Sequence, residues 1–163
     1  MYKKYVNASA RCYKSITLIN NNIISHNIPF EGIRHDENIN GISINNFFIV
    51  TNIDFLGTNN EEHKNENPLE NNRTLDFIIR ITTCDNKQNI GYDIDSFSVD
   101  LREMRKTNQI NRACFDFLNY TRTTKIDNLD LPGGTGKYVI KVLVKDSEEK
   151  DYTIQTMSQL MIV

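Results

Sequence analysis

The chain has 163 residues, the length of one ordinary domain, and a chain of this length buries roughly 70% of its unfolded surface without disulfides or metal ions. Its β-branched residues (21 Ile, 13 Thr and 7 Val) far outnumber its 10 Leu and 3 Ala, which excludes a helix bundle or a coiled coil. Its 19 Lys and Arg residues nearly balance 21 Asp and Glu residues, so no global field attracts nucleic acid or an anionic membrane. We therefore expect a single all-β domain over residues 1–163.

The first predicted strands precede residue 50. Ser15–Ile19 alternates between polar and apolar residues, and three asparagines follow it, a composition typical of a turn. Farther along, Asn40-Gly41 separates two candidate strands, residues 33–39 and 42–50. An Asn-Gly pair in this position is the strongest short-range signal for a β-hairpin, so we expect the two segments to pair antiparallel.

A central strand and a long polar loop are predicted next. Phe47–Val50 is apolar on both faces, which indicates a strand covered on both sides that continues through Ile53 and Phe55. Residues 58–73 contain a single Leu among polar and charged residues, so burial cannot compensate for the entropy of ordering them. We expect residues 58–73 to form a long surface loop.

The segment from residue 75 to residue 101 predicts a hairpin. One face of its first strand carries Leu75, Phe77, Ile79 and Ile81. Residues 85–89 have turn composition, and a return strand begins at Tyr92. The alternation slips between Ile94 and Phe97, because that step is odd. A β-bulge near Asp95-Ser96 would restore the inward face.

The last third of the chain predicts further strands. Residues 101–112 show no clean period and fit either a short helical turn or a loop, and residues 114–118 fit a short strand. A turn at residues 131–134 leads into the clearest alternation of the chain, residues 138–144, and residues 152–163 form the last strand. Seven to nine strands with this spacing, and no alternation with helices, indicate an antiparallel β-sandwich.

The same region carries a family resemblance. Residues 129–144 (LDLPGGTGKYVIKVLV) resemble the late strands of immunoglobulin-like sandwiches, where a Pro/Gly loop leads into Gly-x-Tyr and an alternating strand. Residues 75–101 are similar to the strand–turn–strand unit of small cytosolic bacterial sandwich proteins of unknown function. The resemblance covers residues 75–163 and implies an immunoglobulin-like fold, with no catalytic residues to transfer.

The cysteines and the N-terminus indicate the compartment. Cys12, Cys84 and Cys114 are odd in number and far apart, which fits a reducing environment better than a disulfide framework. No apolar stretch follows the cationic residues near the N-terminus, and no apolar run approaches the ~18 residues of a membrane helix. We expect a cytoplasmic protein without a membrane span.

Catalytic motifs are missing from the sequence. Gly133–Lys137 resembles a phosphate-binding loop, but the pattern requires Gly at the position of Leu131 and Ser or Thr at that of Tyr138. His35 and His63 each lie beside carboxylates, without the repeated spacing of metal ligands. We therefore predict that the protein is not an enzyme and binds no cofactor or metal ion.

One interval combines basic and aromatic residues and is the candidate binding site. Its members are Arg102, Arg105, Lys106, Arg112, Tyr120, Arg122 and Lys125. On a β-sheet such residues can hold single-stranded nucleic acid through phosphate contacts and base stacking. The simpler interpretation is a solvated connection whose aromatic residues point into the core.

Two hypotheses of function follow. The first is a non-enzymatic β-sandwich of a bacterial or phage system that works by protein–protein contact, through the loop 58–73, through exposed strand edges or through self-association of the apolar strand 152–163. The second is a ligand or single-stranded nucleic-acid binding module that uses residues 102–125.

Overall fold

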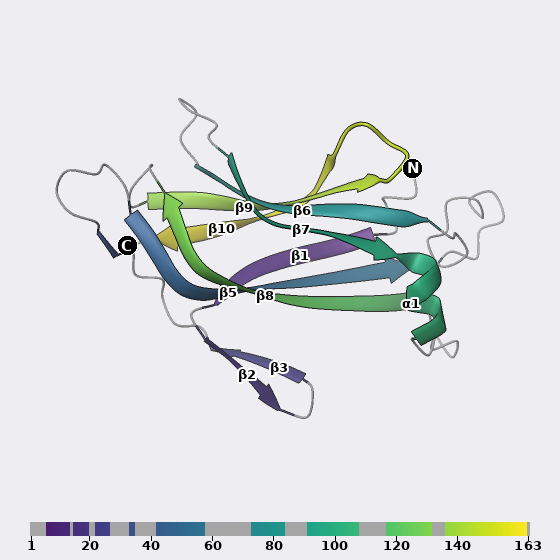
Figure 1. Cartoon of the computed structure of the whole chain (residues 1–163), viewed down its shortest axis with the longest axis horizontal. Helices are drawn as coiled ribbons and strands as arrows, with labels where there is room; N and C mark the ends of the chain where they lie inside the picture. Colours follow the sequence, from purple (N-terminus) through teal and green to yellow (C-terminus); the bar gives the residue numbers. More distant parts are fainter. Residues whose placement is uncertain are drawn as a thin grey trace.

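The computed structural model describes residues 6–13, 15–19, 22–26, 33–34, 42–57, 73–83, 91–107, 117–131 and 136–162, and almost all of them lie in strands (Figure 1). The seven longer strands are β1 (Val6–Tyr13), β5 (Ile42–Leu56), β6 (Thr74–Thr83), β7 (Gly91–Asp100), β8 (Phe117–Leu131), β9 (Gly136–Asp146) and β10 (Thr153–Ile162). The shorter elements are β2 (Ser15–Ile19), β3 (Asn22–His26), β4 (Ile33–Arg34) and the helix α1 (Leu101–Thr107). The longer strands form two antiparallel sheets, which confirms the all-β prediction.

The first sheet is built around β5. β8 pairs with β5 along its length, from Ile42 to Leu56, and β1 pairs with β5 on the opposite edge. This arrangement confirms that residues 47–50 lie on a central strand, but the second face of β5 is not covered throughout, since Phe48 is half-buried and Asn52 is exposed. β4 pairs antiparallel with the first two residues of β5, as expected, but its register is not that of a two-residue turn at Asn40-Gly41, because Arg34 and not Ile39 lies opposite Ile42. The predicted turn at Asn40-Gly41 lies outside the described residues.

The second sheet has the order β10-β9-β6-β7. The four predicted inward residues of β6 are buried, and so are Tyr138, Ile140, Val142 and Val144 of β9. The predicted bulge of β7 is present one residue earlier than expected. The register passes from Ile79 opposite Asp95 to Arg80 opposite Asp93, which leaves Ile94 unmatched.

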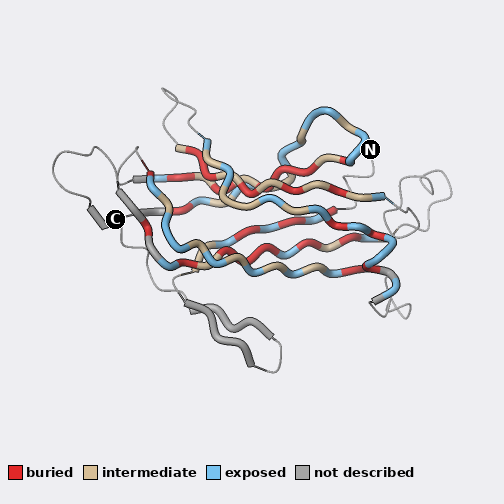
Figure 2. The backbone as a smooth tube through the Cα atoms, in the orientation of Figure 1, coloured by how far each residue is buried: buried red, intermediate tan, exposed pale blue. Residues whose placement is uncertain are grey.

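The two sheets pack face to face over one hydrophobic core, and Figure 2 shows buried and exposed positions alternating along the strands. The largest fully buried side chains are Phe47 and Phe55 of the first sheet and Phe77 of the second. The β-branched residues expected on the inward faces of β6 and β9 are all buried. They are Ile79 and Ile81 of β6 and Ile140, Val142 and Val144 of β9. Ile16 and Leu18, the apolar residues of the alternating segment Ser15–Ile19, are also expected in the core, but they lie in β2, whose side chains are not described.

The first sheet bends sharply at Asn46. This residue has φ of 51°, a left-handed conformation that Asn tolerates better than most residues. Ile44 and Phe47 are both buried although an odd step separates them, so β5 changes its inward face at the bend. In Figure 1, β5 and β8 curve together toward the second sheet at this end. Leu131, the last residue of β8, is fully buried there.

β8 is longer than the sequence-based expectation, whereas α1 is one of the two alternatives left open for residues 101–112 and β2 matches the predicted strand Ser15–Ile19. β8 has 15 residues, whereas only residues 114–118 were predicted as a strand there, and residues 114–116 lie outside the description. Residues 101–107 form α1, capped by Asp100, whose side chain accepts from the backbone N–H groups of Arg102 and Glu103. β2 and β3 pair only with each other, as a hairpin that stands apart from the two sheets in Figure 1.

Candidate functional site

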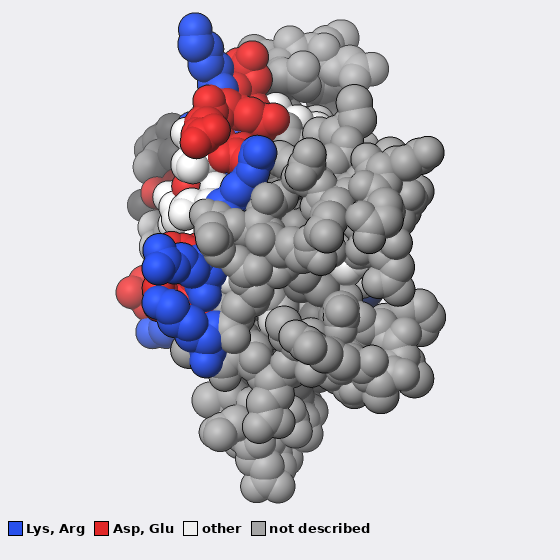
Figure 3. Space-filling view, turned by 90° about the vertical axis from the view of Figure 1, so that its right-hand side faces the viewer, with Lys and Arg blue, Asp and Glu red and all other residues white. Residues whose placement is uncertain are grey.

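The candidate binding residues do not gather in one place. Arg102 and Lys106 lie exposed on α1, where Lys106 forms an ion pair of 2.6 Å with Glu103. Figure 3 faces this end of the molecule and shows basic side chains over α1, apart from the acidic side chains that gather above them. Arg105 belongs to α1 without a described side chain, and Arg112 lies outside the described residues.

The alternation of β8 separates the remaining three candidates. Tyr120 and Arg122 face the second sheet and are half-buried. Lys125 points to the outer face and pairs with Asp127 at 2.8 Å. Because successive strand residues point to opposite faces, the sequence interval 102–125 does not form a continuous surface among the described residues.

A cluster centred on Asp95 joins the two sheets where β7 and β8 lie side by side. Asp95 accepts hydrogen bonds from Arg122 Nε at 3.0 Å, from Arg122 Nη2 at 3.3 Å and from the Thr124 hydroxyl at 2.5 Å. Its side chain is only 8% exposed. Burial would raise the pKa of Asp95, but the hydrogen bonds from Arg122 and Thr124 outweigh it and hold the pKa below its ordinary value.

Aromatic rings extend this cluster into the core. Phe97 of β7 stacks on Phe77 of β6 with a centroid distance of 5.4 Å and on Tyr120 of β8 at 5.8 Å. The Arg122 guanidinium lies over the Phe97 ring at 5.0 Å. With its carboxylate oxygens engaged by Arg122 and Thr124, Asp95 is placed to hold the sheets together rather than to take a proton from a substrate.

The opposite side of the sandwich is also closed by side chains. Ala8 and Ala10 of β1 are buried, and their small side chains let β1 lie close to β10. Gln155 Nε2 of β10 donates to the carbonyl oxygen of Val6, and the Ser158 hydroxyl donates to that of Ala10 at 3.1 Å. These bonds occupy carbonyl groups on the edge of β1 that does not pair with β5.

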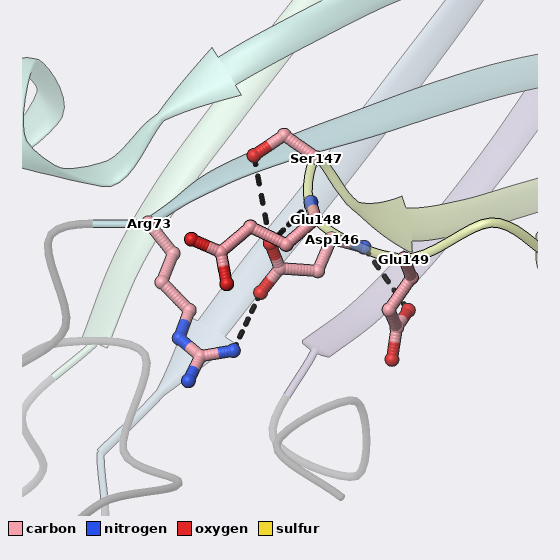
Figure 4. Close-up of polar contacts among 5 residues, drawn as sticks. All are labelled: Arg73, Asp146, Ser147, Glu148 and Glu149. Carbon is pink, nitrogen blue, oxygen red and sulfur yellow. Dashed lines mark hydrogen bonds and ion pairs between the residues drawn. The ribbon is translucent and has the colours of Figure 1, made fainter.

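A polar cluster closes the end of the sandwich near α1 (Figure 4). Asp146 is 2% exposed, forms an ion pair with Arg73 at 2.6 Å and accepts from the backbone N–H of Glu148. Glu149 in turn accepts from the backbone N–H of Asp146. Arg73, predicted as the last residue of the surface loop, is exposed and directly precedes β6, and its side chain is anchored to Asp146. Residues 58–72 lie outside the description.

The exposed apolar residues of the second sheet lie on its outer face. Ile154 is 48% exposed and Met157 is 61% exposed. Ile154 pairs with Leu143, which is only 8% exposed, and Leu143 in turn pairs with the half-buried Ile78 of β6. We call Ile78, Leu143, Ile154 and Met157 the outer apolar patch.

A constant period of two along residues 152–163 would place Ile154 and Met157 on opposite faces of the last strand. The register of β10 shifts between Ile154 and Thr156, so that Ile154 and Met157 share the outer face. Leu160, beyond the bulge, points inward and is buried. A sequence pattern read with a constant period of two could not place these residues.

The residues that the structure describes bear on two kinds of chemistry, metal binding and nucleophilic attack. Among them, no group of three His, Cys, Asp or Glu side chains is placed to hold a metal ion. Burial raises the pKa of the Cys12 thiol to about 12, which keeps it protonated and weakly nucleophilic at neutral pH. Cys84 and Cys114 lie outside the described residues, as do His35 and His63. No described helix is long and apolar enough to cross a membrane.

Comparison with known proteins does not assign a function. No protein-family model matches the chain, and no curated protein matches it.

Proposed function

We propose that this protein is a non-enzymatic β-sandwich that works by protein–protein contact, as an accessory component of a bacterial or phage system. The observation that carries the proposal is the outer apolar patch. Ile154 and Met157 are two of the three large apolar side chains found strongly exposed among the described residues, and they share one sheet face. Contiguous exposed apolar groups are typical of contact surfaces.

The outer apolar patch would supply part of the energy of a specific contact, because association itself costs on the order of 4–15 kcal/mol. Complete burial of an Ile or Met side chain contributes roughly 1.5–3 kcal/mol. Because about half of each side chain is exposed, covering Ile154 and Met157 would supply on the order of 2–3 kcal/mol. Lys141 pairs in register with Met157, so a cation borders the apolar residues. Such a surface fits a partner with apolar residues at its centre and polar groups around them.

The topology supports the immunoglobulin-like part of the proposal. Counting the longer strands in chain order, the first, second and fifth form one sheet, and the third, fourth, sixth and seventh form the other. Sandwiches of the immunoglobulin type likewise place their first, second and fifth strands in one sheet and the third, sixth and seventh in the other. The scattered cysteines support a cytoplasmic location for the protein.

The contact surface can be tested with matched charge substitutions. Met157→Glu should weaken association at least tenfold, because a buried carboxylate would replace an apolar contact. Leu56→Glu is the control, since Leu56 is 43% exposed at the end of β5 in the other sheet. Sedimentation velocity over a range of concentrations reports self-association. Contacts with other proteins can be detected by photo-crosslinking. The protein, with a photo-reactive residue at position 157 or 56, is expressed in cells of the source organism, and crosslinked adducts identify its partners.

The expected result is self-association or a discrete crosslinked adduct that depends on position 157 and not on position 56. A monomer at all concentrations, together with no adduct specific to position 157, would show that the outer apolar patch is not a contact surface.

A further inference from the structure

The outer face of the first sheet differs in chemistry from that of the second. Side chains of β1, β5 and β8 that share this face meet in four cross-strand rows, which we call the β5 platform. The rows are Asn7–Asp54–Asn119, Ser9–Asn52–Thr121, Arg11–Val50–Thr123 and Tyr13–Phe48–Lys125. From the first row to the last, six residues of strand span about 20 Å at ~3.3 Å per residue.

Hydrogen bonds between neighbouring strands orient the polar half of the platform. Asn119 Nδ2 donates to Asp54 Oδ1 at 2.7 Å, and the Thr121 hydroxyl donates to Asn52 Oδ1 at 2.9 Å. These bonds use one oxygen of Asp54 and the amide oxygen of Asn52. The second carboxylate oxygen and the Asn52 amide NH₂ have no partner among the described residues. The platform therefore presents fixed hydrogen-bonding groups toward solvent.

Two aromatic rings form the other half. Tyr13 of β1 and Phe48 of β5 are directly opposite in register, and both are half-buried on the outer face. Phe48 lies on the central strand of the sheet. The core does not require its ring, because the inward residues of β5 already fill the core. Half-buried rings beside oriented amide and carboxylate groups can contact both the apolar and the polar surfaces of one ligand.

The charges of the platform decide what kind of ligand fits. Arg11 contributes a positive charge and Asp54 a negative one, while Lys125 is already paired with Asp127 at 2.8 Å. A phosphate backbone would gain little from this nearly neutral face and would be repelled by Asp54 and Asp127. A neutral ligand with many hydroxyl groups fits better, because planar amides and carboxylates bind hydroxyls and aromatic rings pack on C–H faces.

We propose that the β5 platform binds a neutral oligosaccharide. One or more sugar rings pack on Tyr13 and Phe48, and Asn52, Asp54 and Asn119 bind the hydroxyl groups of the units that follow. This site lies on the sheet opposite to the outer apolar patch, so it is independent of the proposed protein contact.

The proposal can be tested by titrating the ¹⁵N-labelled protein with four neutral probes: cellohexaose, maltohexaose, chitohexaose and mannohexaose. At least one probe should shift amide resonances of β1, β5 and β8 at about 10 mM, where a ligand of millimolar affinity binds most of the protein. Phe48→Ala should weaken that binding about tenfold. Asn52→Ala should weaken it severalfold, and this exposed position tolerates Ala without loss of the fold.

Met157→Ala is the control for the sugar titration and should bind the probe as the unmodified protein does, whatever its effect on protein contacts. Three outcomes would overturn the proposal. In the first, none of the four probes shifts these resonances. In the second, binding is unchanged in both Phe48→Ala and Asn52→Ala. In the third, oligo(dT) shifts the same resonances and the sugars do not, which would show that the β5 platform binds a polyanion instead of a neutral sugar.

Discussion

The Asp95–Arg122 pair should contribute measurably to stability, and its removal offers the sharpest test of how the two sheets are joined. Asp95→Asn keeps the size of the side chain and removes its charge. Hydrogen bonds to charged groups contribute roughly 1.5–3 kcal/mol each when buried. Because the Arg122 side chain is 36% exposed, solvent screens the pair, and we expect a loss of about 2 kcal/mol in the free energy of unfolding at pH 7.

The control for this substitution lies on the same strand. Asp93 forms a comparable pair with Arg80 at 2.5 Å, but the Asp93 side chain is 46% exposed, whereas that of Asp95 is 8% exposed. Exposed pairs of this kind contribute about 0–1 kcal/mol, so Asp93→Asn should cost much less than Asp95→Asn. Urea denaturation of the unmodified protein, Asp95→Asn and Asp93→Asn measures the difference in the free energy of unfolding. Equal slopes of this free energy against urea concentration would exclude changes in the denatured state.

The pH dependence gives a second criterion for the same pair. The pKa of Asp95 is lower in the folded protein than in the unfolded chain, so the unfolded chain binds more protons in acid. The stabilisation is complete above the unfolded pKa of about 3.9 and is lost as the pH falls through the lower folded pKa. The difference between the unmodified protein and Asp95→Asn should therefore shrink below about pH 4. A difference that is absent at pH 7, or equal at pH 7 and pH 3, would refute the role assigned to Asp95.

Three further predictions address the core, a thiol and the nucleic-acid hypothesis. Ile140→Ala, at a buried position of β9, should cost about 2–4 kcal/mol in urea denaturation, and a change within about 0.5 kcal/mol would mean that the inward face is wrong. In a Cys84→Ser/Cys114→Ser variant, the remaining Cys12 thiol should react with a maleimide at pH 7 only after unfolding, because burial raises its pKa to about 12. Single-stranded oligonucleotides should give no salt-dependent mobility shift, because the cations of residues 102–125 are divided between α1 and two faces of β8. A shift abolished by substituting Arg102 and Lys106 would instead support nucleic-acid binding.

The strands that could be predicted are those whose inward residues are all apolar. β6 and β9 follow a strict alternation of buried Ile, Val, Leu, Phe and Tyr residues, which is the direct signature of a half-buried strand. β8 could not be predicted in the same way, because Arg122 and Thr124 occupy inward positions. Their burial depends on Asp95, which is 27 residues from Arg122 in the sequence and belongs to the other sheet.

The candidate binding site was less predictable than the fold for a related reason. The sequence groups Arg102 to Lys125 because they are close along the chain, whereas the sheets group residues by strand pairing. Tyr13, Phe48 and Lys125 form one row of the β5 platform although they come from three distant segments. No local pattern marks such a row, because its members become neighbours only once the register of all three strands is known.

The way the sandwich is closed limits where a partner can bind. A free strand edge would allow another chain to extend either sheet, and such edges were among the predicted contact surfaces. However, Gln155 and Ser158 bind the free edge of β1, and Asp95 and Arg122 tie β7 to β8. Extension of the first sheet along β1 would have to break the bonds from Gln155 and Ser158. The two outer faces require no such rearrangement, and they differ in chemistry: one exposes Ile154 and Met157, and the other presents oriented polar groups beside Phe48. Binding through the faces, with the sheets left intact, is therefore the mode that this architecture favours.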